Sequence, residues 1–292
     1  MTAPVPNPAP FPSSCLVSAL VRLIKFDQGS VLSSGRVPPS TSMFTELCGS
    51  MSSIRATAWR LLSLLVGLCG PSLCPLHPSL GRLMGESLRR LRARGSGALS
   101  AVGVMERQNL YRAVAGLVHA GGLAVGRQLA SEALLVSMIE FYGSAAPEPQ
   151  VDNRTKIEAR ASKKSKHHSL DAAIVSPQGS ESSPPAFFRL DEVSAQGAMF
   201  NLLEALLESC GPLMQASVRA HFDALSIHMA SCCSDAAIAS TRDTNSISEH
   251  HAAALDILRI HSLQLLLASL TVPAGHRPPY LSQVRLVMML LH

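Results

Sequence analysis

Cysteine and histidine side chains occur in two short groups that would suit a metal ion. Cys69, Cys74 and His77 have the spacing C-x4-C-x2-H, and thiolate and imidazole groups are the usual zinc ligands in proteins. No second ligand pair follows them at a suitable spacing. The other group has two adjacent cysteines, which rarely supply two corners of one tetrahedron, near two histidines: Cys232, Cys233, His221 and His228. We therefore expect no metal site.

Motifs for catalysis are missing from the chain. The sequence has no phosphate-binding glycine loop, no nucleophile elbow and no HExxH pair. An enzyme would require the fold to bring distant histidine and cysteine residues together. We expect a protein without catalytic activity and without a cofactor.

Three LxxLL segments are candidates for partner recognition. A helix with this pattern can lay its leucines in an apolar groove of another protein. In a leucine-rich helical array the same spacing arises from core packing. We favour the core interpretation, because leucines that faced a partner would leave neighbouring apolar positions stranded. The leucines of the three segments are Leu61, Leu64 and Leu65, then Leu203, Leu206 and Leu207, and finally Leu263, Leu266 and Leu267.

Basic residues gather in two places. Lys163, Lys164 and Lys166 lie in the polar stretch ASKKSKHHSLD, which is either a charged linker or a nuclear-localisation patch. The other place is one face of a helix expected over residues 79–94. That face is a solvated surface in the ordinary interpretation and a contact to an acidic partner or rRNA in the alternative. Its arginines are Arg82, Arg89, Arg90, Arg92 and Arg94.

A leucine-rich unit occurs twice in the chain. RLLSLLVGLCGP at residues 60–71 returns as NLLEALLESCGP at residues 201–212, with apolar residues at helical spacing. The Gly-Pro pair predicts a sharp helix end, with glycine in the left-handed conformation. Such a unit cannot bury its apolar face alone, so neighbouring units must stack on it. The predicted fold class is all-α, a HEAT/armadillo-like helical-repeat solenoid with a disordered insert.

The amino-acid composition favours a helical protein. It argues against a secreted disulfide-rich protein, a membrane-spanning protein and a surface for stacking bases. Apolar residues are 47% of the chain and aromatic residues only 4%, so the core must be built from aliphatic side chains that favour helices. The odd number of cysteines, seven, favours a reducing, intracellular compartment. No apolar run approaches the roughly 18 residues that a membrane span needs, so we expect no membrane segment. The net charge of +5 is mild, and no aromatic residues interleave with the basic clusters to stack on bases.

The chain divides into four segments by composition. Residues 1–41 are predicted to be mostly disordered, 42–142 to be helical repeats, 143–190 a disordered basic and Ser/Pro-rich linker, and 191–292 further helical repeats. Breaks are expected at 95–97, at 121–122 and over a polar loop at 231–248. The expected helices cover residues 13–26, 52–68, 79–94, 106–120, 123–142, 192–209, 213–230, 249–270 and 281–292.

Four features in the same order resemble the proline-, glutamic acid- and leucine-rich protein family, the animal form of the Rix-type pre-rRNA-processing scaffold. A helix of the kind VRxxxxxxLxxxxxxCG is similar to residues 54–70, and a KKxK linker patch matches Lys163, Lys164 and Lys166. A second helix ends in CGPL, as at residues 210–213, and a Pro-Tyr segment leads into a leucine helix, as at 279–291. The family's acidic tail and most of its N-terminal repeats have no counterpart, so we expect a partial chain.

The resemblance implies a nuclear scaffold for large ribosomal subunit biogenesis, located in the nucleolus and nucleoplasm. Its implied partners are a WD-repeat propeller subunit, another helical-repeat subunit, an AAA ATPase and the pre-ribosomal particle, while direct contact with RNA stays open. It also implies nuclear-receptor coregulation through LxxLL motifs. The alternative is a generic HEAT/armadillo adaptor for nuclear transport or transcription coregulation.

Overall fold

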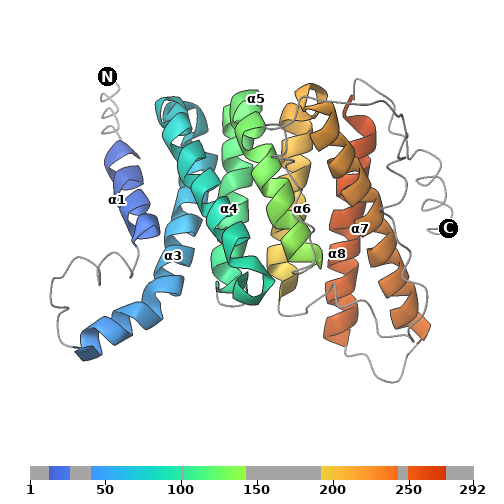
Figure 1. Cartoon of the computed structure of the whole chain (residues 1–292), viewed down its shortest axis with the longest axis horizontal. Helices are drawn as coiled ribbons and strands as arrows, with labels where there is room; N and C mark the ends of the chain where they lie inside the picture. The colour runs from blue at the N-terminus through green and yellow to red at the C-terminus, as the bar shows by residue number, and fades with distance from the viewer. Residues whose placement is uncertain (1–12, 27–40, 100–101, 143–191, 243–248, 274–292) are drawn as a thin grey trace, which may run out of the picture.

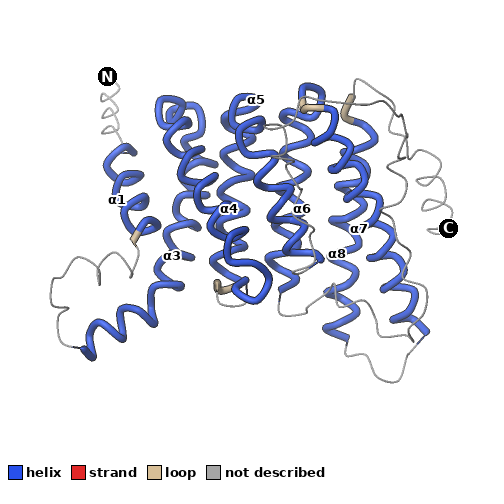
Figure 2. The backbone as a smooth tube through the Cα atoms, viewed as in Figure 1, coloured by secondary structure: helices blue, strands red, loops and turns tan. Residues whose placement is uncertain are grey.

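The computed structural model describes residues 13–26, 41–99, 102–142, 192–242 and 249–273. All the regular structure in these ranges is helical (Figures 1 and 2), which confirms the all-α prediction. The α-helices follow one another across the molecule, from α1 at one end to α7 and α8 at the other (Figure 1). Their bounds are α1 Ser13–Lys25, α3 Thr41–Cys69, α4 His77–Leu99, α5 Val104–Tyr142, α6 Val193–Cys210, α7 Ala216–Arg242 and α8 Glu249–Thr271.

The element α5 is a hairpin of two helical arms. Gly122 has φ 57° and ψ −142° and interrupts the helix, a conformation that glycine adopts without a Cβ penalty. The arms run side by side, because Arg107 on the first forms an ion pair with Glu140 on the second. The sequence predicted this break at Gly121-Gly122, and the structure confirms it.

Both Cys-Gly-Pro sequences lead from a long helix into a 3-10 turn. The turns are η1, Gly70–Leu76, and η5, Gly211–Leu213. The predicted left-handed glycine was wrong: Gly211 has φ −49° and ψ −45°, in the right-handed helical region. Close packing explains the glycine instead, since a Cβ on Gly211 would lie 2.7 Å from Cγ1 of Val272.

Three helix boundaries differ from the prediction more than the others do. Helix α3 begins at Thr41, α4 continues through the Gly95-Ser96-Gly97 stretch to Leu99, and α7 extends to Arg242 through the predicted polar loop. In α7, the hydroxyl of Ser234 donates a hydrogen bond back to the Ala230 carbonyl, 2.8 Å away. Such back-bonding satisfies the polar side chain within the helix, so a serine-rich stretch does not require a loop.

One apolar core runs through the array. Helix α5 packs against α3, α4 and α6, and α6 packs against α8. Its buried residues are mainly leucine, alanine and valine, and they extend from Val17 in α1 to Ala268 in α8. A small separate cluster joins α7 and α8 through Ile227, Ala230 and Leu266. The predicted linker at 143–190, most of the N-terminal segment 1–41 and the predicted helix at 281–292 lie outside the described residues.

Helix α8 contains a segment, Ala252–Thr271, that is long and apolar enough to cross a membrane by length and composition alone. Its window has a mean hydropathy of 1.4 although Asp256 and Arg259 interrupt the apolar run. Core helices meet the same criterion, and α8 packs against both α6 and α7. Of this window, 39% is buried inside the structure.

We predict opposite effects from alanine at two helical glycines. A Cβ on Gly126 would lie 2.9 Å from Sγ of Cys210, so Gly126→Ala overpacks the α5–α6 contact and should lower the free energy of unfolding by about 1–3 kcal/mol. Gly67 is exposed with nothing within 4 Å of a Cβ. Gly67→Ala should therefore raise that free energy by roughly 0.5–1 kcal/mol. Equilibrium denaturation measures both, and equal effects at the two positions would contradict this packing.

Candidate interaction surface

A buried polar network lies where the two arms of α5 meet the start of α6. The Arg107 guanidinium donates hydrogen bonds to both oxygens of Glu140, at 3.0 and 3.2 Å. The Tyr111 hydroxyl donates to Oε2 of Glu140 at 2.8 Å. On its other side, Nη2 of Arg107 lies 3.3 Å from Oε1 of Glu192. Because the side chains of Arg107 and Glu140 are fully buried, each charge depends on its partners.

Burial governs the titration of this network. It raises the pKa of the Glu140 carboxyl, and the Arg107 charge and the Tyr111 hydrogen bond oppose that rise. Burial, together with the charge of Glu140, also raises the pKa of Tyr111 well above its ordinary value. Tyr111 therefore keeps its proton and remains the donor to Glu140.

A second polar network joins α7 to α8. The Arg219 guanidinium donates to Oδ1 of Asp223 at 2.8 Å and also to the backbone carbonyl of Ser269. The hydroxyl of Ser269 donates to the same Asp223 oxygen at 2.6 Å. Sequence analysis missed both networks. The available signal was an arginine, a glutamate or an aspartate within an otherwise apolar helical stripe.

The three LxxLL segments occupy different environments. Leu203, Leu206 and Leu207 are all fully buried in α6, which agrees with the core interpretation. In the third segment, Leu266 is buried, but Leu267 is 60% exposed, so the core interpretation was wrong for Leu267. Leu263 packs partly buried against the small α7–α8 cluster.

The core interpretation was wrong for most of the first segment. Leu65 is buried, but Leu61 is 44% and Leu64 is 53% exposed. The reason is position in the array: α3 packs on α5 with one face, and the short α1 covers only part of the opposite face. The repeat pattern predicts the periodicity of the apolar residues in a helix. It does not predict whether neighbouring helices cover both faces of that helix.

Exposed leucines occur on both α3 and α1, two helices that pack against each other. Leu61, Leu64 and Leu68 recur at helical spacing along α3, and Leu68 is 83% exposed. Leu16 and Leu23 of α1 are also exposed. We call these five residues the leucine surface. A groove of about 220 Å³ lies between α1 and α3. Most of its lining side chains are apolar: Leu20, Leu23, Ser53, Ile54, Thr57, Ala58 and Leu61.

The basic patch and the first cysteine and histidine group were the other candidate sites from the sequence. Lys163, Lys164 and Lys166 lie outside the described residues. Among the described residues, no group of three or more His, Cys, Asp or Glu side chains could hold a metal ion. Cys69 is half-buried, Cys74 is exposed and neither is in a disulfide.

Of the second cysteine and histidine group, the structure brings Cys232 and His228 together. Sγ of Cys232 lies 3.6 Å from Nδ1 of His228, and the Tyr142 hydroxyl lies 2.9 Å from the same nitrogen. Burial lowers the pKa of His228 and raises the pKa of Cys232 to about 11. A thiol that keeps its proton at neutral pH is a poor nucleophile.

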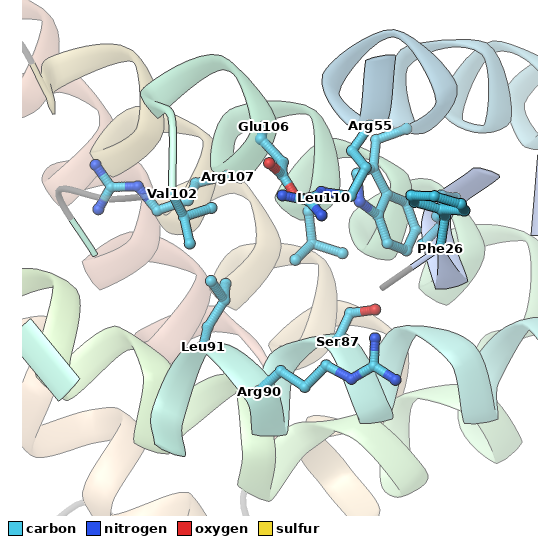
Figure 3. Close-up of a pocket in the computed structure, with 11 residues that line it drawn as sticks. Phe26, Arg55, Ser87, Arg90, Leu91, Val102, Glu106, Arg107 and Leu110 are labelled. Carbon is cyan, nitrogen blue, oxygen red and sulfur yellow. Dashed lines mark hydrogen bonds and ion pairs between the residues drawn. The ribbon is translucent and has the colours of Figure 1, made fainter. Parts of the chain in front are cut away.

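A pocket of about 210 Å³ opens between α3, α4 and α5 near the end of α1. Arg55 and Glu106 face one another on one wall, while Ser87, Arg90 and Leu91 of α4 form the opposite wall (Figure 3). Arg55 Nε donates to Oε1 of Glu106 at 2.9 Å. The pocket also includes Ile24, Phe26, Trp59, Val102, Arg107 and Leu110.

Comparison with protein-family models, with curated proteins and with solved structures finds no match for this chain.

We predict that two LxxLL leucines differ sharply in their contribution to stability. Leu206→Ala removes a fully buried side chain and should lower the free energy of unfolding by about 2–5 kcal/mol. Leu64→Ala, on the leucine surface, should change it by less than about 0.5 kcal/mol. Chemical denaturation of both variants provides the measurement. A large loss for Leu64→Ala would mean that this leucine is covered in the folded protein.

Proposed function

We propose that this chain is a non-enzymatic interaction scaffold in large ribosomal subunit biogenesis. The observation that carries the interaction role is the leucine surface, which presents Leu61, Leu64 and Leu68 outward from one end of an all-helical array. A contiguous exposed apolar patch is typical of a protein–protein interface. The assignment to ribosome biogenesis comes from the motifs that resemble the proline-, glutamic acid- and leucine-rich family.

The finer fold that we propose is a HEAT/armadillo-like solenoid. Helices pack on those that are one or two positions away in the chain, as α3, α4 and α6 do on α5 and as α6 and α7 do on α8. The two Cys-Gly-Pro units both end in 3-10 turns, and Cys210 packs closely on Gly126 of the preceding helix. A repeated turn at equivalent positions is what a stacked array of similar units requires.

The partners that follow from this proposal are a WD-repeat propeller subunit, a second helical-repeat subunit, an AAA ATPase and the pre-ribosomal particle. The leucine surface would bind one of the two subunits. Lys163, Lys164 and Lys166 would direct the protein to the nucleus, with the nucleolus and nucleoplasm as its location.

A second candidate function is coregulation through the LxxLL segment at Leu61–Leu65, within an adaptor for transcription or nuclear transport. Exposure of Leu61 and Leu64 favours it. Leu65 weakens it, because this leucine is buried in the core and would have to leave the core to enter a receptor groove. We therefore rank it below the scaffold.

Affinity purification from nuclear extract tests the proposal. The wild-type chain should recover a propeller subunit and ribosome-assembly factors, and the double variant Leu64→Glu/Leu68→Glu should lose the propeller or helical-repeat subunit at unchanged melting temperature. Leu213→Glu is the matched control, because Leu213 is 60% exposed in η5, away from the leucine surface. Recovery of transport factors or receptors alone, without ribosome-assembly factors, would refute the biogenesis role.

A further inference from the structure

The groove between α1 and α3 is an apolar site at the surface of the array. The two helices lie side by side at one end of the molecule (Figure 1) and pack against each other. Leu23 and Leu61 line the groove and are each 44% exposed, while Leu20 and Ala58 also line it and are buried. Leucine side chains therefore reach solvent inside the groove, and binding of a partner there would remove them from water.

The exposed leucines define the length of segment that the groove can hold. Leu16 and Leu23 of α1 are two helical turns apart, as are Leu61 and Leu68 of α3, a distance of roughly 10 Å along each helix. Both walls are helices, and a third helix packs with its ridge of side chains in the groove between them. Among the described residues no strand offers an edge to an extended peptide. A helix with apolar residues recurring over two turns therefore suits this groove.

The charges on the two helices favour an acidic partner. Arg60 of α3 and Arg22 of α1 are exposed, and neither forms an ion pair with a residue that the structure describes. Lys25, the other basic residue of α1, pairs with Glu86 of α4. The only acidic residue within the bounds of α1 and α3 is Glu46, about two helical turns before the groove. The two walls of the groove therefore carry positive charge that is not compensated by their own residues.

We propose that this groove binds an amphipathic, acidic helix of a partner protein. Apolar side chains of that helix enter between Leu23 and Leu61, and carboxylates on its flanks pair with Arg60 and Arg22. Arg60 is one helical turn before Leu64 and so lies on the same side of α3. Its planar guanidinium can bind a carboxylate through two hydrogen bonds. The inference rests on the interaction role proposed for the leucine surface and specifies the kind of segment that this surface binds.

A labelled peptide tests the chemistry of the partner. The probe is a helical peptide of about sixteen residues, roughly 24 Å long, made of Ala, Leu and Glu with its leucines in one stripe. Fluorescence anisotropy should show saturable binding of this stripe peptide to the full chain. A peptide of the same composition with its leucines dispersed around the helix should bind about tenfold more weakly. The stripe peptide with Lys in place of Glu should lose a similar factor.

Variants of the chain locate the binding site. Leu61→Glu should weaken binding of the stripe peptide about tenfold or more. The matched control is Leu267→Glu, at a leucine of α8 that is 60% exposed, and it should change binding less than about twofold. Circular dichroism checks that each variant is folded.

A charge exchange tests the role of Arg60 without removing an apolar side chain. Arg60→Glu should weaken binding of the stripe peptide about fivefold and should bind the lysine peptide more tightly than the wild type does. Arg127→Glu makes the same change of charge at an exposed position on the second arm of α5. It should have neither effect.

Several results would overturn the proposal. No saturable binding of the stripe peptide up to about 1 mM, equal binding of the dispersed peptide, or equal losses for Arg60→Glu and Arg127→Glu would each do so. A groove that holds a second copy would give a wild-type dimer that Leu61→Glu dissociates and the stripe peptide does not. A membrane-binding surface would sediment with phosphatidylserine vesicles without competition from the peptide. Either outcome also contradicts an acidic helix as the occupant.

The peptide experiment can be separated from the test of ribosome biogenesis. Binding of the stripe peptide, with no ribosome-assembly factors recovered from nuclear extract, would refute the biogenesis role and leave this inference intact. Recovery of a subunit that Leu64→Glu/Leu68→Glu loses, with no binding of the stripe peptide, would refute this inference alone.

Discussion

The guanidinium of Arg107 is the constraint on which the middle of this array depends. It is fully buried and lies between two carboxylates, Glu140 on the second arm of α5 and Glu192 immediately before α6. Removing one member of such a group leaves a buried charge without a partner, which typically costs about 3–5 kcal/mol. The network thus requires the α5 hairpin and α6 to be in place together, although residues 143–191 separate them in the sequence.

Packing around this centre determines which surfaces remain for partners. Helices α5 and α6 are covered on both sides by their neighbours, so the leucines of α6 are core residues. Helix α3 packs against the long helix α5 on one side, and the short α1 covers only part of its other side. Leu61, Leu64 and Leu68 of α3 are therefore exposed. Between these regions lies the pocket of α3, α4 and α5, which has Trp59 and Arg90 among its lining residues. The same leucine-rich sequence pattern therefore stabilises the centre and leaves leucines exposed on α3.

The sequence predicted the helical class, most helices and the break at Gly122, because helical periodicity and glycine conformation are local properties. It did not predict the exposure of Leu61 and Leu64, since exposure depends on which helix lies next to α3. It also missed the Arg107–Glu140–Glu192 network and the pocket, which join residues far apart in the chain. The glycines after Cys69 and Cys210 were correctly identified as special, but the reason was close packing rather than a left-handed turn.

We infer that the buried network makes the array one cooperative unit. Trp59 fluorescence reports on the α3 side alone, whereas far-ultraviolet circular dichroism reports on all helices. Unfolding curves in guanidinium chloride from the two signals should coincide in the wild type, and Arg107→Ala should shift both to lower denaturant. Separate transitions in the wild type, or an Arg107→Ala variant as stable as the wild type, would contradict it.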